Sequence, residues 1–231
     1  MRSVTEVVAA LDAPGLAGEA QLLAEDVARR RDLPLRIVHI EAEPAALSTT
    51  ELAAAIVGEL RPDSLVVMET DRASRWSGKY SVAEHVVDRW GGQSLVVGPA
   101  CVSSGRTGPI VVPVNGSAGA ERAIGPAAEL AAAFEVEVVL IRVASGDAVG
   151  PARDYLAALT SSSGHRTHLI EATDHVAALV AAADELASRF IVISSRGDRT
   201  VTRPTMSRTT SGLAAEAPCP VLIVGEPPEI A

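Results

Sequence analysis

The feature that most restricts the fold of this chain is an order of strands and helices that occurs twice. Residues 7–40 and 110–143 share strand, turn, helix and strand at matching offsets. The repeat distance of roughly 100 residues is the length of a domain and exceeds that of solenoid repeats. The sequence therefore predicts two domains of one fold, over 1–103 and 109–231. The Ser-Gly-Arg-Thr-Gly-Pro stretch at 104–109 is predicted to link them.

Val-rich runs of strand length alternate with longer segments of helical periodicity throughout the chain. Continuous apolar strands joined by helices indicate a parallel sheet covered on both faces, so the fold class is α/β. The first half has one strand–helix unit fewer than the second. We expect a threonine cap on the helix at 49–60 and a kink at Gly125-Pro126. The predicted strands are 5–11, 35–42, 64–69, 94–100, 110–114, 136–143, 166–172, 190–194 and 220–224, and the predicted helices are 17–31, 49–60, 81–90, 117–134, 150–162 and 175–187.

Charge and hydropathy exclude several classes of function. The formal net charge of -9 argues against a nucleic-acid binder, which needs a broad basic surface. Apolar runs fall short of the roughly 20 residues of a membrane span, and the first residues do not have the pattern of a secretory signal. Cys101 and Cys219 follow no metal or redox spacing, so we expect a cytoplasmic protein with reduced thiols.

Three stretches of the second half carry a resemblance to a known family. In order along the chain they read VVPVNGSAGAERAIGPAAELA, ELASRFIVISSRG and SGLAAEAPCPVLIVGE. Together they resemble the universal stress protein family in its tandem form. The resemblance implies two Rossmann-like domains of the adenine nucleotide alpha hydrolase-like type. It also implies a five-stranded parallel sheet in the order 3-2-1-4-5 in the second domain, and a shortened sheet in the first.

The same resemblance implies how the two domains associate. In the family the fifth strands pair across a two-fold axis. Here the runs at 94–100 and 220–224 would pair within one chain to make a pseudo-dimer, and the same contact would serve a homodimer. Such pairing would cover two sheet edges that otherwise invite aggregation.

The resemblance also implies a nucleotide site in the second half. Many family members bind ATP through Gly, two residues, Gly, nine residues, then Gly and Ser or Thr. These positions fall here on Ser194, Gly197, Ser207 and Arg208. Serine is small, and arginine keeps its amide while adding a cation suited to phosphate. The expected ligand is ATP, accompanied by Mg²⁺. The remaining residues assigned by the resemblance are Pro113, Asn115, Gly116, Val143 and Thr209.

The first half is a poorer match to this signature. Asp12 lies at the expected strand end, but Glu69 and Arg72 occupy the positions of the first two glycines. A carboxylate repels a polyphosphate, so we expect this domain to be a structural partner without nucleotide.

Simpler interpretations stay open. The arginines from Arg196 to Arg208 fit a solvated loop, and Asn115 fits a turn residue that caps the next helix. The protein would then be a nucleotide-free structural or interaction pseudo-dimer. His165 and His168 are three residues apart and have no third ligand nearby. Surface positions are expected for all the histidines, which are His39, His85, His165, His168 and His175. The chain carries no recognisable catalytic set, so any ATP hydrolysis would be slow and incidental. The backbone at Ser194 and Ser207, and a cavity behind Asn115, distinguish the two readings.

Overall fold

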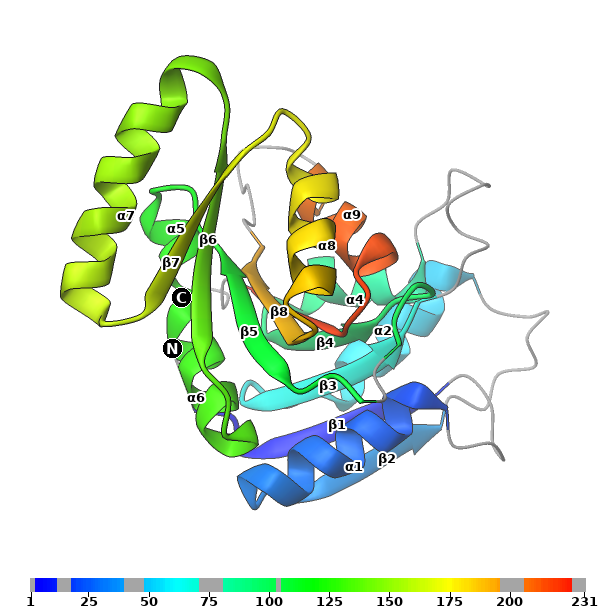
Figure 1. The fold of residues 1–231 in the computed structure, drawn as a ribbon. Helices are drawn as coiled ribbons and strands as arrows, with labels where there is room; N and C mark the ends of the chain where they lie inside the picture. The colour runs from blue at the N-terminus through cyan, green and yellow to red at the C-terminus, as the bar shows by residue number, and fades with distance from the viewer. Residues whose placement is uncertain are drawn as a thin grey trace.

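All strands of the described chain belong to one sheet. The structure is a computed structural model, and it describes residues 3–11, 18–39, 48–70, 81–102, 105–195 and 206–225. Within these residues nine strands follow the order β2-β1-β3-β4-β9-β8-β5-β6-β7 (Figure 1). The strands are β1 Glu6–Leu11, β2 Leu35–His39, β3 Ser64–Glu69, β4 Gln93–Val97, β5 Gly108–Pro113, β6 Val138–Ala144, β7 Arg166–Glu171, β8 Ser188–Ser194 and β9 Val221–Val224.

The second half has the predicted strand order. Its strands lie as β7-β6-β5-β8-β9, all parallel, which is the expected 3-2-1-4-5 arrangement. The first half, β2-β1-β3-β4, is the same arrangement without the outermost strand. Val7 pairs with Leu35 and Ile110 pairs with Val138, so the equivalent strands also share one register. The sheet of the first half is therefore shortened, as predicted.

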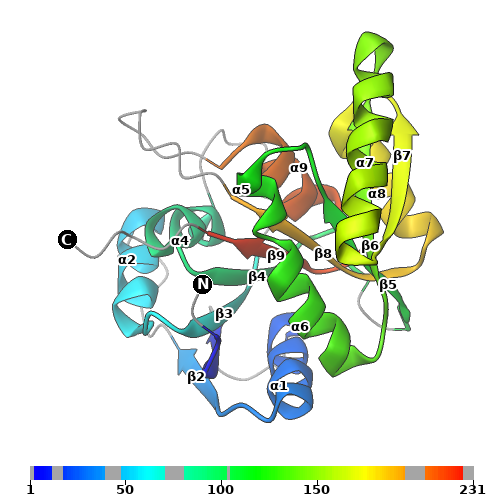
Figure 2. The ribbon, with the colours of Figure 1, turned by 90° about the vertical axis from the view of Figure 1, so that its left-hand side faces the viewer.

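The two halves join through their last strands. β4 pairs antiparallel with β9, from Gln93 opposite Val224 to Val96 opposite Val221, and Figure 2 shows the two strands side by side. This is the predicted pairing within one chain. Each of these strands has a neighbour on both sides, so the edge that a fifth-strand homodimer would need is already used.

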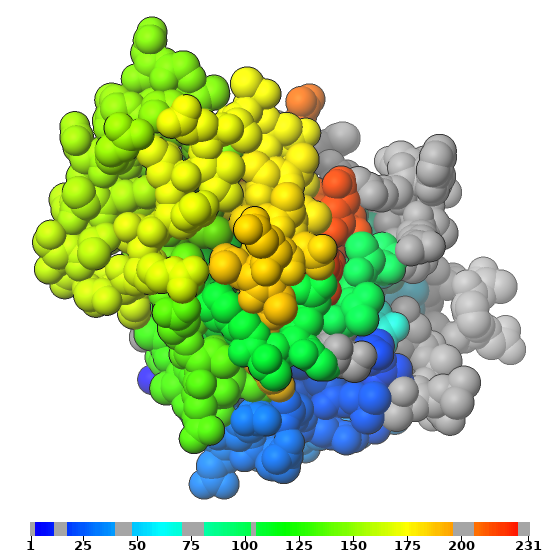
Figure 3. All heavy atoms as spheres, viewed as in Figure 1, coloured from blue at the N-terminus to red at the C-terminus, as the bar shows by residue number. Residues whose placement is uncertain are grey.

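Helices cover the sheet on both faces. The apolar sides of α1, α6 and α7 pack on one face, and those of α2, α4, α8 and α9 pack on the other (Figure 1). Each of the two core clusters contains strand residues of both halves, and in Figure 3 the second half directly adjoins the blue first half. The helices are α1 Glu19–Arg31, α2 Thr49–Glu59, α4 Val82–Trp90, α5 Ala118–Glu121, α6 Ile124–Phe134, η1 Gly146–Ala148, α7 Val149–Ser163, α8 His175–Glu185 and α9 Arg208–Glu216.

Two local predictions need correction. The cap of α2 is Ser48 rather than a threonine, because Glu51 reaches back to the Ser48 N–H and completes a capping box. The segment at 117–134 is broken into α5 and α6 before the expected kink. Pro126 then lies in the first turn of α6, where no helical partner for its missing N–H is required. In the described part of the chain, no helix combines the length and apolarity that crossing a membrane requires.

Candidate functional site

A cavity of about 300 Å³ lies at the carboxyl ends of β5, β6 and β8. Ligands of parallel α/β sheets bind at this edge, because the loops that follow the strands converge there. Apolar side chains from two strands and α8 line one part of the cavity: Ile141, Val143, Ile193 and Leu179. Polar side chains line another part: Asn115, His175, Ser194, Ser207 and Thr209. Pro113, Val114 and Ala120 complete the lining. The cavity therefore combines an apolar wall with a set of hydrogen-bonding groups.

The N-terminus of α9 supplies the backbone donors of this site. Ser207 is the N-cap with φ −60°, and its Oγ accepts a 3.1 Å hydrogen bond from Thr210 N–H. The N–H groups of Arg208 and Thr209 have no acceptor among the described residues. Arg208 is exposed and forms no ion pair with a described carboxylate. Two amides, the positive end of the helix dipole and a guanidinium thus favour an anion at this point.

The two serines of the degenerate glycine signature have ordinary backbone conformations. Ser194 is the last residue of β8, and Ser207 has a negative φ. Neither is among the described non-glycine residues with positive φ, which are Asp32, Glu135 and Ala187. Glycine is therefore not required at either position for backbone reasons.

Asn115 forms the turn after β5. Its Oδ1 accepts hydrogen bonds from Ser117 N–H at 3.0 Å and from Ser117 Oγ at 2.7 Å. Ser117 in turn caps α5 through Ala120 N–H. Gly116 has φ +85°, a backbone conformation that favours glycine. The acceptor oxygen of Asn115 is engaged by the turn, while the side-chain NH₂ makes no hydrogen bond to a described residue.

Most residues assigned from the sequence lie together. Those that line the cavity are Pro113, Asn115, Val143, Ser194, Ser207 and Thr209. Gly116 and Arg208 each adjoin a lining residue along the chain but are not themselves in the lining. Gly197 lies outside the described residues, as do Arg196, Arg199 and Arg203.

Sequence reasoning missed His175, which was assigned to the surface without a role. It is exposed, as expected, but it is the first residue of α8 and lines the cavity beside Leu179. A topological signal was available: α8 follows β7, and every helix after a parallel strand begins at the carboxyl edge of the sheet. Ala120, Ile141 and Ile193 were also missed, because apolar lining residues look like ordinary core residues in sequence.

At the equivalent edge of the first half, carboxylates of the chain itself lie at the N-termini of the helices. Glu69 lies at the end of β3, and its Oε1 accepts a 3.0 Å hydrogen bond from Ala20 N–H at the start of α1. A Cβ on Gly18, the N-cap of α1, would lie 2.4 Å from this oxygen. Ser81 caps α4 in a capping box with Glu84. Asp12 and Arg72 lie outside the described residues. The described helix N-termini on this side are thus already supplied with negative charge.

A side chain of the first half also contacts the start of α9. Asp88 on α4 accepts a hydrogen bond from the Met206 N–H, and Met206 directly precedes the N-cap Ser207. Burial, together with the nearby Glu84, raises the pKa of Asp88 to about 6, although the Met206 N–H opposes this shift.

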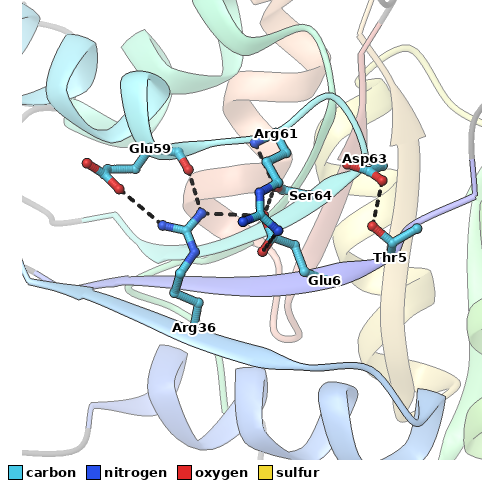
Figure 4. Close-up of polar contacts among 7 residues, drawn as sticks. All are labelled: Thr5, Glu6, Arg36, Glu59, Arg61, Asp63 and Ser64. Carbon is cyan, nitrogen blue, oxygen red and sulfur yellow. Dashed lines mark hydrogen bonds and ion pairs between the residues drawn. The ribbon is translucent and has the colours of Figure 1, made fainter.

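The polar cluster around Glu6 lies at the opposite, amino edge of the sheet. Glu6 accepts hydrogen bonds from Ser64, Arg36 and Arg61 (Figure 4). Burial raises the pKa of Glu6, but these three partners outweigh it and hold the pKa below its ordinary value. A buried carboxylate with all its partners supplied by the chain is a structural feature rather than a ligand site.

Neither metal nor thiol chemistry marks another site in the described residues. They contain no group of three or more His, Cys, Asp or Glu side chains placed to hold a metal ion. Cys101 and Cys219 are free, and burial raises the pKa of each thiol to about 12. Thiols with so high a pKa are poor nucleophiles near neutral pH.

The sequence of this chain matches a known protein family, and its fold is similar to those of solved structures. The model of the universal stress protein family matches residues 107–225. A functionally unknown protein from Pseudomonas aeruginosa PAO1 is similar in structure with a TM-score of 0.71 and 12% identity, over 97% of this chain and 93% of that chain. A universal stress protein from Archaeoglobus fulgidus has a TM-score of 0.60 and 18% identity, over 95% of this chain and 88% of that chain.

A universal stress protein solved in complex with cAMP matches 51% of this chain and 96% of its own, with 23% identity and a TM-score of 0.41. No curated protein sequence is significantly similar to this chain.

Proposed function

Because the chain belongs to the universal stress protein family, we propose that its second half binds an adenine nucleotide, ATP first of all, at the cavity beside α9. One observation carries the proposal: a cavity of about 300 Å³ lies against a helix start whose first two N–H groups have no acceptor among the described residues. The apolar wall of Val143, Ile141 and Leu179 suits a purine ring, and the donors at Arg208 and Thr209 suit phosphate.

We propose different roles for the two repeats. A family-like domain at 109–231 holds the nucleotide, and one at 1–103 is its structural partner. Glu69 and Glu84 support this assignment, since each supplies a carboxylate at a helix start where a phosphate would otherwise go. One nucleotide per chain is therefore expected.

The role proposed for the bound nucleotide is regulatory. In the described lining no hydrogen bond joins His175 to a serine or threonine as base to nucleophile, so the proposed signal is occupancy rather than turnover. The proposed location is the cytoplasm, where ATP is available and the free thiols Cys101 and Cys219 remain reduced.

A second candidate function is a nucleotide-free structural pseudo-dimer. Ser207 Oγ already satisfies Thr210 N–H, and Asn115 Oδ1 already satisfies Ser117, so part of the site is capped by the chain itself. The antiparallel pairing of β4 with β9 also gives the two halves a common sheet without any ligand.

Equilibrium dialysis with labelled ATP distinguishes the two candidates. The nucleotide function predicts saturable retention of one ATP per chain below about 1 mM, and no retention at that concentration selects the structural function. Arg208→Gln should weaken retention several-fold, because it removes a cation beside the phosphates. Arg89→Gln, at an exposed arginine in the last turn of α4, is the matched control and should leave retention unchanged.

A further inference from the structure

We propose that the site takes its nucleotide without a divalent cation, because its described lining offers hydrogen-bond donors and no carboxylate. The inference rests on the proposed function and concerns the chemical form of the ligand. It departs from the expectation, drawn from the family resemblance, that Mg²⁺ accompanies ATP.

The polar side chains of the lining do not fit Mg²⁺. This ion prefers carboxylate oxygens in octahedral geometry and is usually bound by one or two carboxylates together with phosphates. The described polar lining is Asn115, His175, Ser194, Ser207 and Thr209, which contains no Asp or Glu.

Two described carboxylates near these residues along the chain are already engaged. Asp174 Oδ1 accepts hydrogen bonds from Val176 N–H and Ala177 N–H, both at 3.0 Å, and so caps α8. Glu121 accepts a 2.8 Å hydrogen bond from Tyr155 OH. Neither is in the described lining of the cavity.

Asn115 is the residue that decides whether the site prefers metal-free or Mg²⁺-bound nucleotide. Ser117 N–H can only donate, so the oxygen of the Asn115 amide must face Ser117 and the NH₂ group must point elsewhere. Aspartate in the same turn would present a second, negatively charged oxygen at the place of this NH₂. Asparagine has NH₂ where aspartate has this oxygen. A potential metal ligand is thus replaced by a hydrogen-bond donor, which requires an acceptor on the bound nucleotide.

The chain supplies the positive charge that the cation would otherwise bring. The N–H groups of Arg208 and Thr209, which have no acceptor among the described residues, favour phosphate oxygens with available lone pairs. The dipole of α9 and the Arg208 guanidinium favour them as well. Mg²⁺ on the phosphates occupies those lone pairs and adds positive charge beside Arg208. Metal-free ATP should therefore be the better ligand.

Titration calorimetry of the full chain with ATP tests this in two buffers of equal ionic strength, one containing EDTA and one containing excess Mg²⁺. We expect a Kd at least about 3-fold lower in EDTA. Asn115→Asp should reverse the order, so that ATP binds more tightly with Mg²⁺. Mn²⁺ with ATP, followed by electron paramagnetic resonance, should show bound Mn²⁺ for Asn115→Asp and free Mn²⁺–ATP for the wild type at the same concentration.

The wild-type titrations decide the matter even if the variant does not fold. Binding that requires Mg²⁺ overturns this inference and leaves the proposed function standing. Absence of binding in both buffers overturns both. Asp198→Asn is a further control, since Asp198 lies outside the described residues; a Mg²⁺ dependence that this variant abolishes would assign the metal to Asp198 and contradict the inference.

Discussion

Replacing Ser207 with aspartate should separate the stability of α9 from its ability to hold an anion. Ser207 caps α9 through its 3.1 Å hydrogen bond from Thr210 N–H. Aspartate caps helices about as well as serine, and the helix dipole favours its charge. Ser207→Asp should therefore change the free energy of unfolding by less than about 0.5 kcal/mol.

The same carboxylate should weaken ATP binding. A phosphate held by the N–H groups of Arg208 and Thr209 would lie about 5 Å from the new carboxylate. Two unit charges at that distance repel by about 3 kcal/mol at an effective dielectric constant near 20, and by about 1 kcal/mol in bulk water. Ser207 is exposed, so a value between these limits is appropriate. A loss of about 2 kcal/mol corresponds to a Kd roughly 30-fold higher.

The assay combines titration calorimetry with urea unfolding on the same preparations. Ser48→Asp is the matched control, because Ser48 is also an exposed serine at a helix N-cap but lies in the first half. It should leave the Kd for ATP unchanged. If Ser207→Asp binds ATP as tightly as the wild type, the phosphates do not lie at the start of α9 and the reasoning is wrong.

Three further predictions test the surroundings of the site. Burial raises the pKa of Asp88 from its ordinary value of 3.8 to about 6. The stability that this group contributes is therefore fully present below pH 3.8 and is lost as the pH rises through about 6. Asp88→Asn should lack this loss of stability, which is at most about 1 kcal/mol after screening by solvent. The urea midpoint at pH 4.5 and at pH 7.5 measures it. A decrease in the midpoint between these pH values that is equal in wild type and variant would contradict the prediction. Glu69→Ala should cost about 1 kcal/mol of unfolding free energy because Ala20 N–H loses its acceptor, with ATP affinity unchanged by calorimetry; a weaker affinity would argue against separate halves. Gly212→Ala places a Cβ 2.8 Å from the Val176 side chain, so it should lose about 1–3 kcal/mol despite the helix propensity of alanine; an unchanged Tm would show that α8 and α9 are less tightly packed.

The alternation of apolar strands and helices made a parallel α/β sheet predictable, whereas the strand order of the second half was implied by the family resemblance. The pairing of β4 with β9 followed from the family resemblance, because an apolar fifth strand in each half needs a partner. The family resemblance also implied that Asn115, Ser194 and Ser207 lie near one another, and these three residues line the same cavity at the carboxyl edge of the sheet.

Side-chain hydrogen bonds were less predictable, because a short polar residue has several local partners of similar energy. Sequence reasoning left Asn115 either a ligand contact or a turn residue. The structure shows its oxygen in the turn and its NH₂ without a described partner. Glu69 was expected to repel phosphate, but its capping of α1 depends on how β3 and α1 lie in space. His175 was missed for the same reason, since only the fold brings it to the cavity.

The most direct test of the account is a titration of the isotope-labelled protein with ATP, followed by the amide resonances in two-dimensional NMR. We expect the resonances of the backbone amides of Arg208 and Thr209 and of the side-chain NH₂ of Asn115 to shift and to saturate at one ATP per chain. Resonances of Ala20 and Ser81, at the equivalent edge of the first half, should stay in place. Shifts confined to the first half, or none at Arg208 and Thr209 when ATP is saturating, would contradict it.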